Sequence, residues 1–337
     1  MKAKINQAEN QSFISIVVSF RNESKNLEKH VQALCTQNYP KDKYEVVFVD
    51  DGSTDDSLQI VKNEISKTSF PSVRLIHLNW AGTAAARNEG VKKAKGEIMA
   101  ITDADAVPDP NWLCEISNSF KNEEIGMVCG KIKEINDLCE VDQQSAHTTY
   151  EKTFWFTNVS FNRTVFEKIG GFDRRFRRGS DYDFIVRLLD AGFEYTYNPN
   201  AVVWHIKPPL TLSKALKDEL KNGKADLLFL TVDARIFLRN LTKIPLSTKR
   251  AVTHTLATLF SAPLLIVAFL LGGIPGLLFA TVLIAAFIVT RVHMSKTKRF
   301  RLLRACACIP ISIALWYHLL KSITLAFHKR SGETHLS

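Results

Sequence analysis

The sequence predicts an α/β fold, a mostly parallel sheet with helices on both of its faces. Three observations support this prediction. Short apolar runs rich in β-branched residues alternate with segments of helical periodicity. Polar residues gather where these runs end, and stretches of about 20 apolar residues occur only in the last part of the chain.

The first half of the chain supplies four strand-like runs, residues 13–20, 44–49, 73–78 and 97–102. Helices are expected between them, beginning near Ser24, near Ser53 or Thr54, and near Thr83. Right-handed crossovers then place the carboxyl ends of all four strands on one edge of the sheet, where ligands of such sheets bind. Further along, residues 154–161 and 202–205 are expected strands.

The chain divides into a polar N-terminal tail (1–12), an α/β domain (13–240) and a C-terminal apolar region (241–337). The formal net charge of +10 is confined to the last part. Residues 241–337 contain twelve Lys and Arg but one acidic residue, Glu333, whereas residues 1–240 are close to neutral. The tail has no apolar segment and therefore predicts no secretory signal peptide.

Two or three membrane helices are expected in the C-terminal region, at about 251–271, 274–292 and 305–327. A soluble hydrophobic bundle is the alternative. Basic residues lie before the first stretch and between the second and third, so the positive-inside rule places both clusters and the α/β domain in the cytoplasm. His318 and Lys321 interrupt the third stretch, which either crosses the bilayer or lies along its surface.

The basic clusters adjoin apolar stretches, which favours attraction to anionic lipid over nucleic-acid binding. The six cysteines show no CxxC pairing and no metal-ligand spacing. Reduced structural thiols in a cytoplasmic domain are therefore expected.

Two carboxylates, Asp103 and Asp105, follow the fourth expected strand. Oxygen ligands two positions apart can converge on one hard cation and leave coordination positions open for phosphate oxygens. A D-x-D string also occurs by chance in solvated turns, so the prediction of a metal site depends on the neighbouring residues.

Those neighbours come from the other strand ends. Asn22 and Glu23 follow the first strand, and Asp50 and Asp51 follow the second. Asp50 and Asp51 either begin a helix or accept hydrogen bonds from a ribose hydroxyl or a base N–H. Arg87 lies in an expected helix of small residues that can approach a ligand closely. It is either a ligand-binding residue or an ordinary surface arginine.

Asp181 and Asp183 precede an apolar helix that ends before Gly192. One of the two can cap that helix, which leaves the other free to act as a base. His205 ends a short strand and is either a third metal ligand or a packing residue.

Seven segments in this order resemble the family 2 glycosyltransferases of the GT-A fold, over residues 14–205. The segments are SFRNE, VDDGSTD, GTAAARNEG, TDADAVPDP, NVSFNRTVFEKIGGFD, SDYDFIVRLLDAG and VVWH. Each is weakly specific alone, whereas the ordered set is highly specific.

The resemblance implies roles for individual residues. Asp51, with Phe20, Asn22, Glu23 and Asp50, would bind a uridine-type nucleotide, and Arg87 would lie near its base or phosphates. Asp103 would lie by the ribose and the metal, and Asp105 and His205 would bind Mg²⁺ or Mn²⁺. Asn158 would line the strand facing the donor sugar, beside Ser180 and Asp183. Asp181 matches the family's catalytic base and implies an inverting, single-displacement transfer.

Two positions depart from the family pattern. Ser180 replaces a common Glu before the base, which bears on acceptor preference. Phe156 replaces a small residue two positions before Asn158 and is expected to narrow the sugar pocket. Neither change removes a proposed catalytic group.

The sequence lacks a Q-x-x-R-W string after His205, which favours transfer of a single sugar over polymerisation. The expected enzyme therefore uses a nucleotide-sugar donor, a membrane-associated or lipid-linked acceptor and a divalent cation. A non-catalytic sugar-nucleotide-binding membrane scaffold is the main alternative. A nucleotidyltransferase is disfavoured, because no glycine-rich basic loop follows the first strand.

Overall fold

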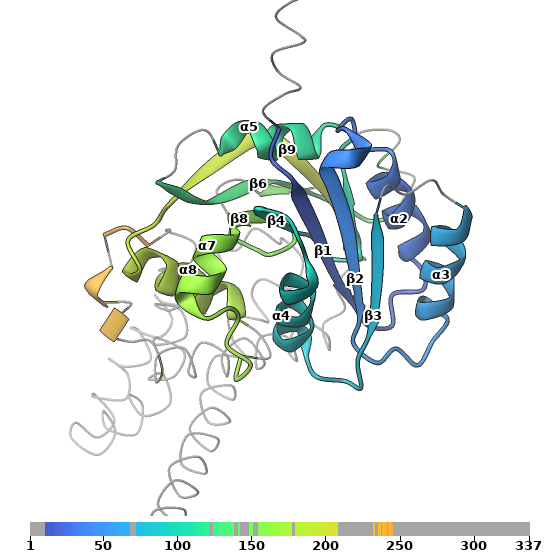
Figure 1. Cartoon of the computed structure of the whole chain (residues 1–337), viewed down its shortest axis with the longest axis horizontal. Helices are drawn as coiled ribbons and strands as arrows, with labels where there is room; N and C mark the ends of the chain where they lie inside the picture. The colour runs from blue at the N-terminus through green and yellow to red at the C-terminus, as the bar shows by residue number, and fades with distance from the viewer. Residues whose placement is uncertain are drawn as a thin grey trace, which may run out of the picture. The chain divides into compact units, whose positions relative to one another are not determined.

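The structure is a computed structural model, and it describes residues 11–67, 72–120, 124–137, 141, 148–150, 154–176 and 179–207. It also describes residues 232, 235–236, 238–240 and 242–244. Figure 1 shows the order of the helices and strands.

The first half of the domain is a parallel sheet, as predicted. Its strands are β1 (Ile14–Phe20), β2 (Tyr44–Asp50), β3 (Val73–His77) and β4 (Ile98–Ile101), in the spatial order β3-β2-β1-β4. The helices between them are α2 (Leu27–Cys35), α3 (Ser57–Lys67) and α4 (Thr83–Lys93), and the 3-10 helix η1 (Lys41–Lys43) precedes β2. All seven residues of β2 are buried, which explains the continuous apolar run of this strand.

Helices cover both faces of this half of the sheet. Ile16 and Val18 of β1 share a buried cluster with Leu27 and Val31 of α2. The intervening Val17 faces α4, where a Cβ added at Gly90 would lie 2.4 Å from Val17 Cγ1. Alternate side chains of a strand point to opposite faces, so α2 and α4 lie on opposite sides. Gly90 lets α4 approach the sheet closely.

The second half of the sheet is mixed. Its strands are β5 (Ala106–Pro108), β6 (Ile125–Ile135), β7 (Thr148–Tyr150), β8 (Val159–Asn162) and β9 (Glu194–Ile206). From β4 the order continues β8-β6-β9-β5, with β7 paired to β6. Among the described strands of this half, only the β6–β9 pair is parallel, because β8 runs antiparallel to both β4 and β6 and β5 runs antiparallel to β9.

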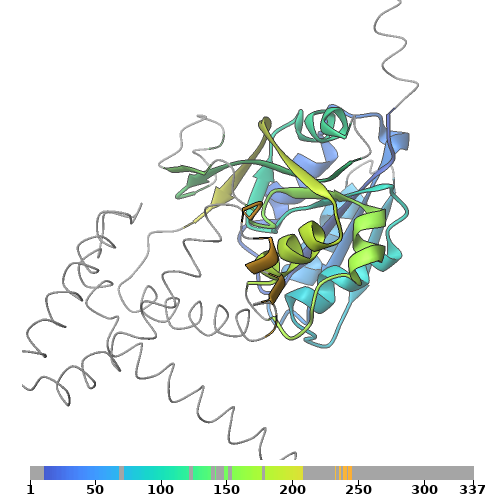
Figure 2. The ribbon, with the colours of Figure 1, turned by 90° about the vertical axis from the view of Figure 1, so that its left-hand side faces the viewer.

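The prediction of a mostly parallel sheet is therefore wrong for residues after β4. The described residues form four parallel and four antiparallel strand pairs. Burial of an apolar run does not depend on the direction of the strand, so hydrophobic pattern alone could not reveal this change. The observed fold is an α/β fold with a curled mixed sheet flanked by helices (Figures 1 and 2).

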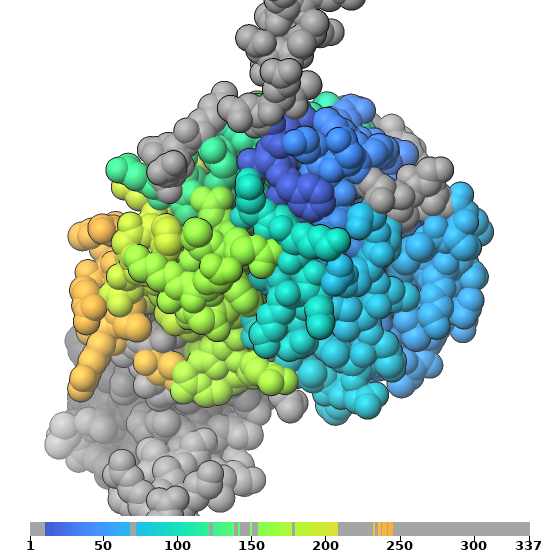
Figure 3. All heavy atoms as spheres, viewed as in Figure 1, coloured from blue at the N-terminus to red at the C-terminus, as the bar shows by residue number. Residues whose placement is uncertain are grey.

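Three more helices complete the described domain: α5 (Trp112–Ser119), α7 (Arg163–Ile169) and α8 (Ser180–Asp190). Figure 3 shows the face on which α4 adjoins α7 and α8. Phe161 of β8, Phe166 of α7 and Phe184 of α8 pack in one aromatic cluster with Phe156 and Phe172. This cluster fixes α7 and α8 to the sheet.

The compact unit that holds the sheet consists of Met1–Pro209 and Asp233–Pro245. Ile244 is 2% exposed, and the Asn240 amide donates to Asp190 Oδ1 at 3.2 Å. The predicted boundary after residue 240 therefore falls inside a segment that packs on this unit.

Among the described residues, no helix has the length and apolar character to cross a bilayer. The expected membrane stretches 251–271, 274–292 and 305–327 lie outside the described residues, as does most of the tail 1–12.

Candidate nucleotide-sugar site

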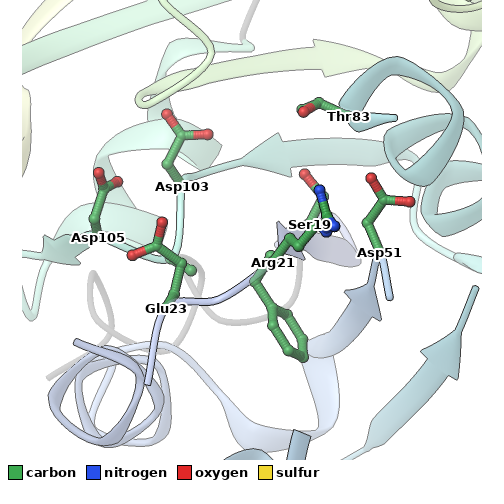
Figure 4. Close-up of a pocket in the computed structure, with 9 residues that line it drawn as sticks. Ser19, Arg21, Glu23, Asp51, Thr83, Asp103 and Asp105 are labelled. Carbon is green, nitrogen blue, oxygen red and sulfur yellow. The ribbon is translucent and has the colours of Figure 1, made fainter. Parts of the chain in front are cut away.

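A pocket opens at the carboxyl ends of β1, β2 and β4, the edge that the sequence predicts for ligands. Its volume is about 230 Å³. It is lined by Ser19, Phe20, Arg21, Glu23, Asp51, Thr83, Asp103, Ala104 and Asp105 (Figure 4). Five predicted site residues, from three strand ends, are thus brought together.

Asp51 lies at one end of the pocket. Its Oδ1 accepts hydrogen bonds from the backbone N–H groups of Ala81 at 2.6 Å and Gly82 at 3.2 Å, and its Oδ2 accepts from Gly82 at 3.0 Å. Gly82 has φ 92°, a left-handed conformation that suits glycine. The loop before α4 therefore holds the Asp51 carboxylate in a fixed position, with unused lone pairs for a ligand donor.

Three carboxylates occupy the other end: Glu23, Asp103 and Asp105 (Figure 4). Burial, and then the negative charge of Asp105, raise the pKa of Glu23 to about 7. A hydrogen bond from Asn26 opposes this rise, while Asp103 adds to it. This concentration of negative charge favours binding of a cation.

Asp103 is held by two partners. Arg87 Nη2 donates to Oδ1 at 3.0 Å, and the Thr157 hydroxyl donates to Oδ2 at 2.7 Å. Burial opposes ionisation, but the Arg87 guanidinium and the Thr157 hydrogen bond outweigh it and hold the pKa of Asp103 below its usual range. Asp103 is therefore an ionised, oriented carboxylate.

Arg87 does not line the pocket, although the sequence predicts it near the base or phosphates. Its guanidinium is buried behind Asp103, 5.1 Å from the ring centroid of Phe156 and 5.8 Å from that of Phe172. Phe156 likewise lies outside the lining of this pocket, and its ring packs against the Arg87 guanidinium; its expected effect on the sugar pocket stays a prediction.

His205 lies beside Asp105. Its Nε2 is 3.4 Å from Asp105 Oδ2, because β9 pairs with β5 directly after Asp105. Burial favours the neutral ring, but Asp105 and then Asp103 outweigh burial and raise the pKa of His205.

The residue types fit a divalent cation, since carboxylate oxygens and an imidazole nitrogen suit Mg²⁺ or Mn²⁺. Within the described part of the chain, no group of three such side chains is arranged as a ready-made metal site. The metal ligands Asp103, Asp105 and His205 therefore remain a proposal.

Asp181 lies in the first turn of α8, two residues after Gly179, which has φ 75°. Burial raises its pKa, against the charge of Arg87 and the backbone N–H groups of Asp181 and Tyr182. The negative charge of Asp103 also raises it, so Asp181 lies within electrostatic reach of the Asp103–Arg87 pair. A carboxylate with a raised pKa is a stronger base than an ordinary aspartate.

Two predicted nucleotide ligands have other positions. Asp50 is fully buried, accepts a hydrogen bond from Ser53 N at 2.9 Å and contacts His77 Nδ1 at 2.7 Å. Asn22, with φ 57°, accepts from Thr54 N at 2.8 Å. Neither lines the pocket: Asn22 joins the loops after β1 and β2, whereas Asp50 joins the loop after β2 to His77 of β3.

Asp183 is also used inside the protein and not at the pocket. Its carboxylate is 1% exposed and forms a two-point ion pair with Arg187. Arg187 in turn donates to the carbonyls of Ile169 and Gly171. Ser180 is buried at the start of α8. Asp183 thus fastens α8 to the end of α7 and does not line the pocket, and its donor or acceptor role stays a prediction.

Asn158 is 1% exposed, and all its amide groups are used within the core. Its Oδ1 accepts from Trp112 Nε1 at 2.8 Å, and its Nδ2 donates to the carbonyls of Lys131 and Ala201 at 2.9 Å each. Asn158 does not line the pocket, and its position facing the donor sugar stays a prediction. The amide joins α5, β6 and β9.

Replacing Asn158 by alanine should lower the free energy of unfolding by about 2–5 kcal/mol, because three partners, two of them buried and one half-buried, lose their hydrogen bonds. Urea unfolding measures this effect. Asn38→Ala is the matched control, since Asn38 is exposed and donates to Asn111 Oδ1. A stable Asn158→Ala protein with a raised KM for donor would restore the donor-sugar role.

The affinity for Mn²⁺ should rise severalfold between pH 6 and pH 8, because ionised Glu23, whose pKa is about 7, adds negative charge beside the proposed ligands Asp103 and Asp105. Ionisation of Glu23 increases above pH 7, which gives the sign of the effect. Titrations of Mn²⁺ at several pH values measure it. Glu23→Gln should remove the part of the pH dependence that comes from Glu23. If Mn²⁺ affinity depends on pH equally in this variant and the wild type, Glu23 is not the group that titrates.

Four further residues line the pocket that the sequence did not single out as site residues: Ser19, Arg21, Thr83 and Ala104. Arg21 Nε donates to Gly52 O at 3.3 Å, and the guanidinium lies 4.5 Å from the ring centroid of Trp80. Arg21 lies within the SFRNE segment and Thr83 within GTAAARNEG, so membership in those motifs was the available signal.

The carboxylate-lined pocket at the strand ends fits a glycosyltransferase with a nucleotide-sugar donor, and the comparison with protein families supports this class. Residues 15–181 match the family described as "Glycosyl transferase family 2". Residues 15–181 are therefore a family 2 glycosyltransferase domain.

The match with this chain covers most of the length of two curated relatives. The "Glycosyltransferase AglE" of Haloferax volcanii is 28% identical over 245 residues, 67% of this chain and 77% of that protein. The second, from Methanococcus voltae, is 29% identical over 235 residues, 64% of this chain and 73% of that protein. Its name is "Dolichyl N-acetyl-alpha-D-glucosaminyl phosphate 3-beta-D-2,3-diacetamido-2,3-dideoxy-beta-D-glucuronosyltransferase".

A solved mannosyltransferase from Pyrobaculum calidifontis, in complex with GDP-Man and Mn²⁺, has a similar fold. The two structures superpose with a TM-score of 0.61 at 20% sequence identity. The superposition covers 91% of this chain and 88% of the mannosyltransferase chain.

Proposed function

We propose that this chain is a metal-dependent, inverting glycosyltransferase that moves one sugar from a UDP-linked donor to a lipid-linked acceptor. The observation that carries the proposal is the pocket at the strand ends. It joins a fixed carboxylate, Asp51, to a cluster of three others, and Asp181 lies within electrostatic reach of that cluster.

The donor nucleotide occupies the pocket in this proposal. The Asp51 carboxylate, held by Ala81 and Gly82, accepts the base N–H, and Phe20 and Arg21 line the same space. The diphosphate extends toward Asp103 and Asp105. Because Arg87 and Thr157 orient Asp103, one carboxylate keeps a constant direction toward the ribose and the cation.

Asp181 acts as the base. It takes the proton from the acceptor hydroxyl while the hydroxyl oxygen forms a bond to the anomeric carbon. The bond from that carbon to the diphosphate oxygen breaks, and its electron pair leaves with the nucleoside diphosphate. Attack from the face opposite to the leaving group inverts the anomeric centre, since no second carboxylate forms a covalent intermediate.

A Mg²⁺ or Mn²⁺ ion held by Asp105, with Asp103 and His205, would supply the positive charge that stabilises the departing diphosphate. The residue types of the site support this assignment, as does the Mn²⁺ that accompanies GDP-Man in the similar mannosyltransferase. Asp105 is our choice for the direct ligand, because Arg87 and Thr157 already bind Asp103.

The lipid-linked acceptor rests on two observations. The Methanococcus voltae relative is named for transfer to a dolichyl-phosphate-linked sugar. The apolar stretches after residue 250, with their basic flanks, are suited to holding the protein at the cytoplasmic face of a membrane. The same composition supports contact with the lipid bilayer and gives no reason for nucleic-acid binding.

Donor screening tests the proposal directly. The full-length chain is heated with UDP- and GDP-sugars, with and without Mn²⁺, and a bound donor raises the unfolding midpoint. The positive donor is then incubated with a polyprenyl-phosphate-linked sugar and with the corresponding free sugar. Mass spectrometry should detect addition of one sugar to the lipid-linked acceptor, and NMR should show the inverted anomer.

Donor binding without hydrolysis or transfer would instead support a non-catalytic sugar-nucleotide-binding scaffold. Addition of many sugars would contradict single transfer. A GDP-sugar as the only ligand would correct the choice of nucleotide and leave the mechanism in place.

A further inference from the structure

The imidazole of His205 lies between two carboxylates from different strands. Its Nε2 is 3.4 Å from Asp105 Oδ2, and its Nδ1 is 3.9 Å from Glu134 Oε1. The sheet creates this arrangement, because β9 pairs with β6 at Glu134↔His205 and with β5 at Ala106↔His205.

The Glu134 side of the ring is buried. The Glu134 side chain is 3% exposed and the His205 side chain 16%. His205 Nδ1 is a buried nitrogen without a hydrogen-bond partner among the described residues. Glu134 lies outside the pocket lining, so direct contact with a ligand there does not explain its position.

Glu134 is also tied to Lys207, which follows β9. Lys207 Nζ donates to Glu134 Oε1 at 2.7 Å, and Lys207 N donates to Ile135 O at 2.8 Å. The ammonium compensates the buried negative charge and holds the carboxylate beside the ring. A movement of about 1 Å would bring Nδ1 and Oε1 to hydrogen-bond distance.

We propose that Glu134 is a positioning residue that accepts the Nδ1–H of His205 and so directs the lone pair of Nε2 toward the cation beside Asp105. A neutral imidazole carries its proton on one nitrogen, and the hydrogen bond made by that nitrogen sets which one remains a ligand. Glu134 does not touch substrate. This inference rests on the proposed function, because it requires His205 to bind the metal.

The binding of Mn²⁺ alone tests this role, without any sugar donor. The concentration of free Mn²⁺ is followed by EPR during titration of the full-length chain. Glu134→Leu should weaken Mn²⁺ binding about 10- to 100-fold, the range for loss of a partner that orients a metal ligand. Glu134→Gln retains an oxygen acceptor and should lose less affinity.

A double-mutant cycle separates positioning from structural support. In a His205→Ala background, the Glu134 substitutions should cause no further loss of Mn²⁺ affinity, since there is no ring left to orient. Glu64→Leu and Glu64→Gln are matched controls. Glu64 is also buried and paired with a lysine, Lys67 at 2.7 Å, but it lies on α3 outside the pocket.

The outcomes are distinct. Wild-type affinity in the Glu134 variants, or an equal loss in the His205→Ala background, would overturn the positioning role and leave the metal proposal standing. No saturable Mn²⁺ binding by the wild-type chain would overturn the metal proposal and this inference with it. If Glu134→Leu does not fold, the Glu134→Gln cycle decides the question in the same way.

Discussion

Asp181→Asn should reduce the rate of sugar transfer by about 10²- to 10⁴-fold while the Kd for the donor changes little. An amide cannot take the proton of the acceptor hydroxyl, and a general base typically contributes a factor of this size. Single-turnover kinetics at saturating donor measures the rate, and calorimetry measures donor binding.

The pH dependence of the wild-type transfer rate is a second test of Asp181 as the base. Only ionised Asp181 accepts a proton, and burial raises its pKa above the ordinary aspartate value. The rate should therefore increase with pH through that raised pKa and then level off. The Asp181→Asn variant should lack this acidic limb.

Asp190→Asn is the matched control, because Asp190 is an exposed residue at the other end of α8 that pairs with Arg239. It should transfer sugar at the wild-type rate. An Asp181→Asn protein that is folded and equally active would show that another group acts as the base.

Asp105→Asn should lower transfer by about 10³-fold and weaken Mn²⁺ binding. The substitution removes the negative charge of the proposed direct ligand, and metal stabilisation of a leaving group amounts to several kcal/mol. Chelation of the wild-type enzyme with EDTA should produce a similar loss, which added Mn²⁺ reverses. Initial rates against Mn²⁺ concentration measure both effects.

Asp109→Asn provides the control for this substitution. Asp109 follows β5, near Asp105 in sequence, and its Oδ1 accepts a hydrogen bond from Asn111 N at 3.1 Å that an amide oxygen can also accept. It should retain activity. Full activity of wild-type protein in EDTA would contradict metal dependence, whatever the Asp105 variant does.

Much of the pocket could be predicted from the sequence. Asp51, Asp103 and Asp105 each follow a buried apolar run, and parallel strands joined by helices bring such positions to one edge. The structure places these three residues in one pocket with Glu23 from the end of β1, which the sequence also predicts for this site.

The hydrogen-bond partners of individual polar side chains were harder to predict. Asn158 and Asp183 lie in the expected motifs, but their hydrogen bonds go to Trp112 and Arg187, partners inside the protein. A motif places the backbone of a residue near a site. Which way its side chain turns depends on the donors and acceptors that packing brings within about 3 Å.

The amino-acid order by itself determined the alternating strands and helices of the first half and the set of carboxylates at their ends. Those features depend on local hydrophobic periodicity and on the handedness of the crossover. Only the tertiary structure decided the antiparallel direction of β8, the burial of Arg87 behind Asp103, and the place of His205 between Asp105 and Glu134. Each depends on contacts between residues far apart in the chain, which no local pattern encodes.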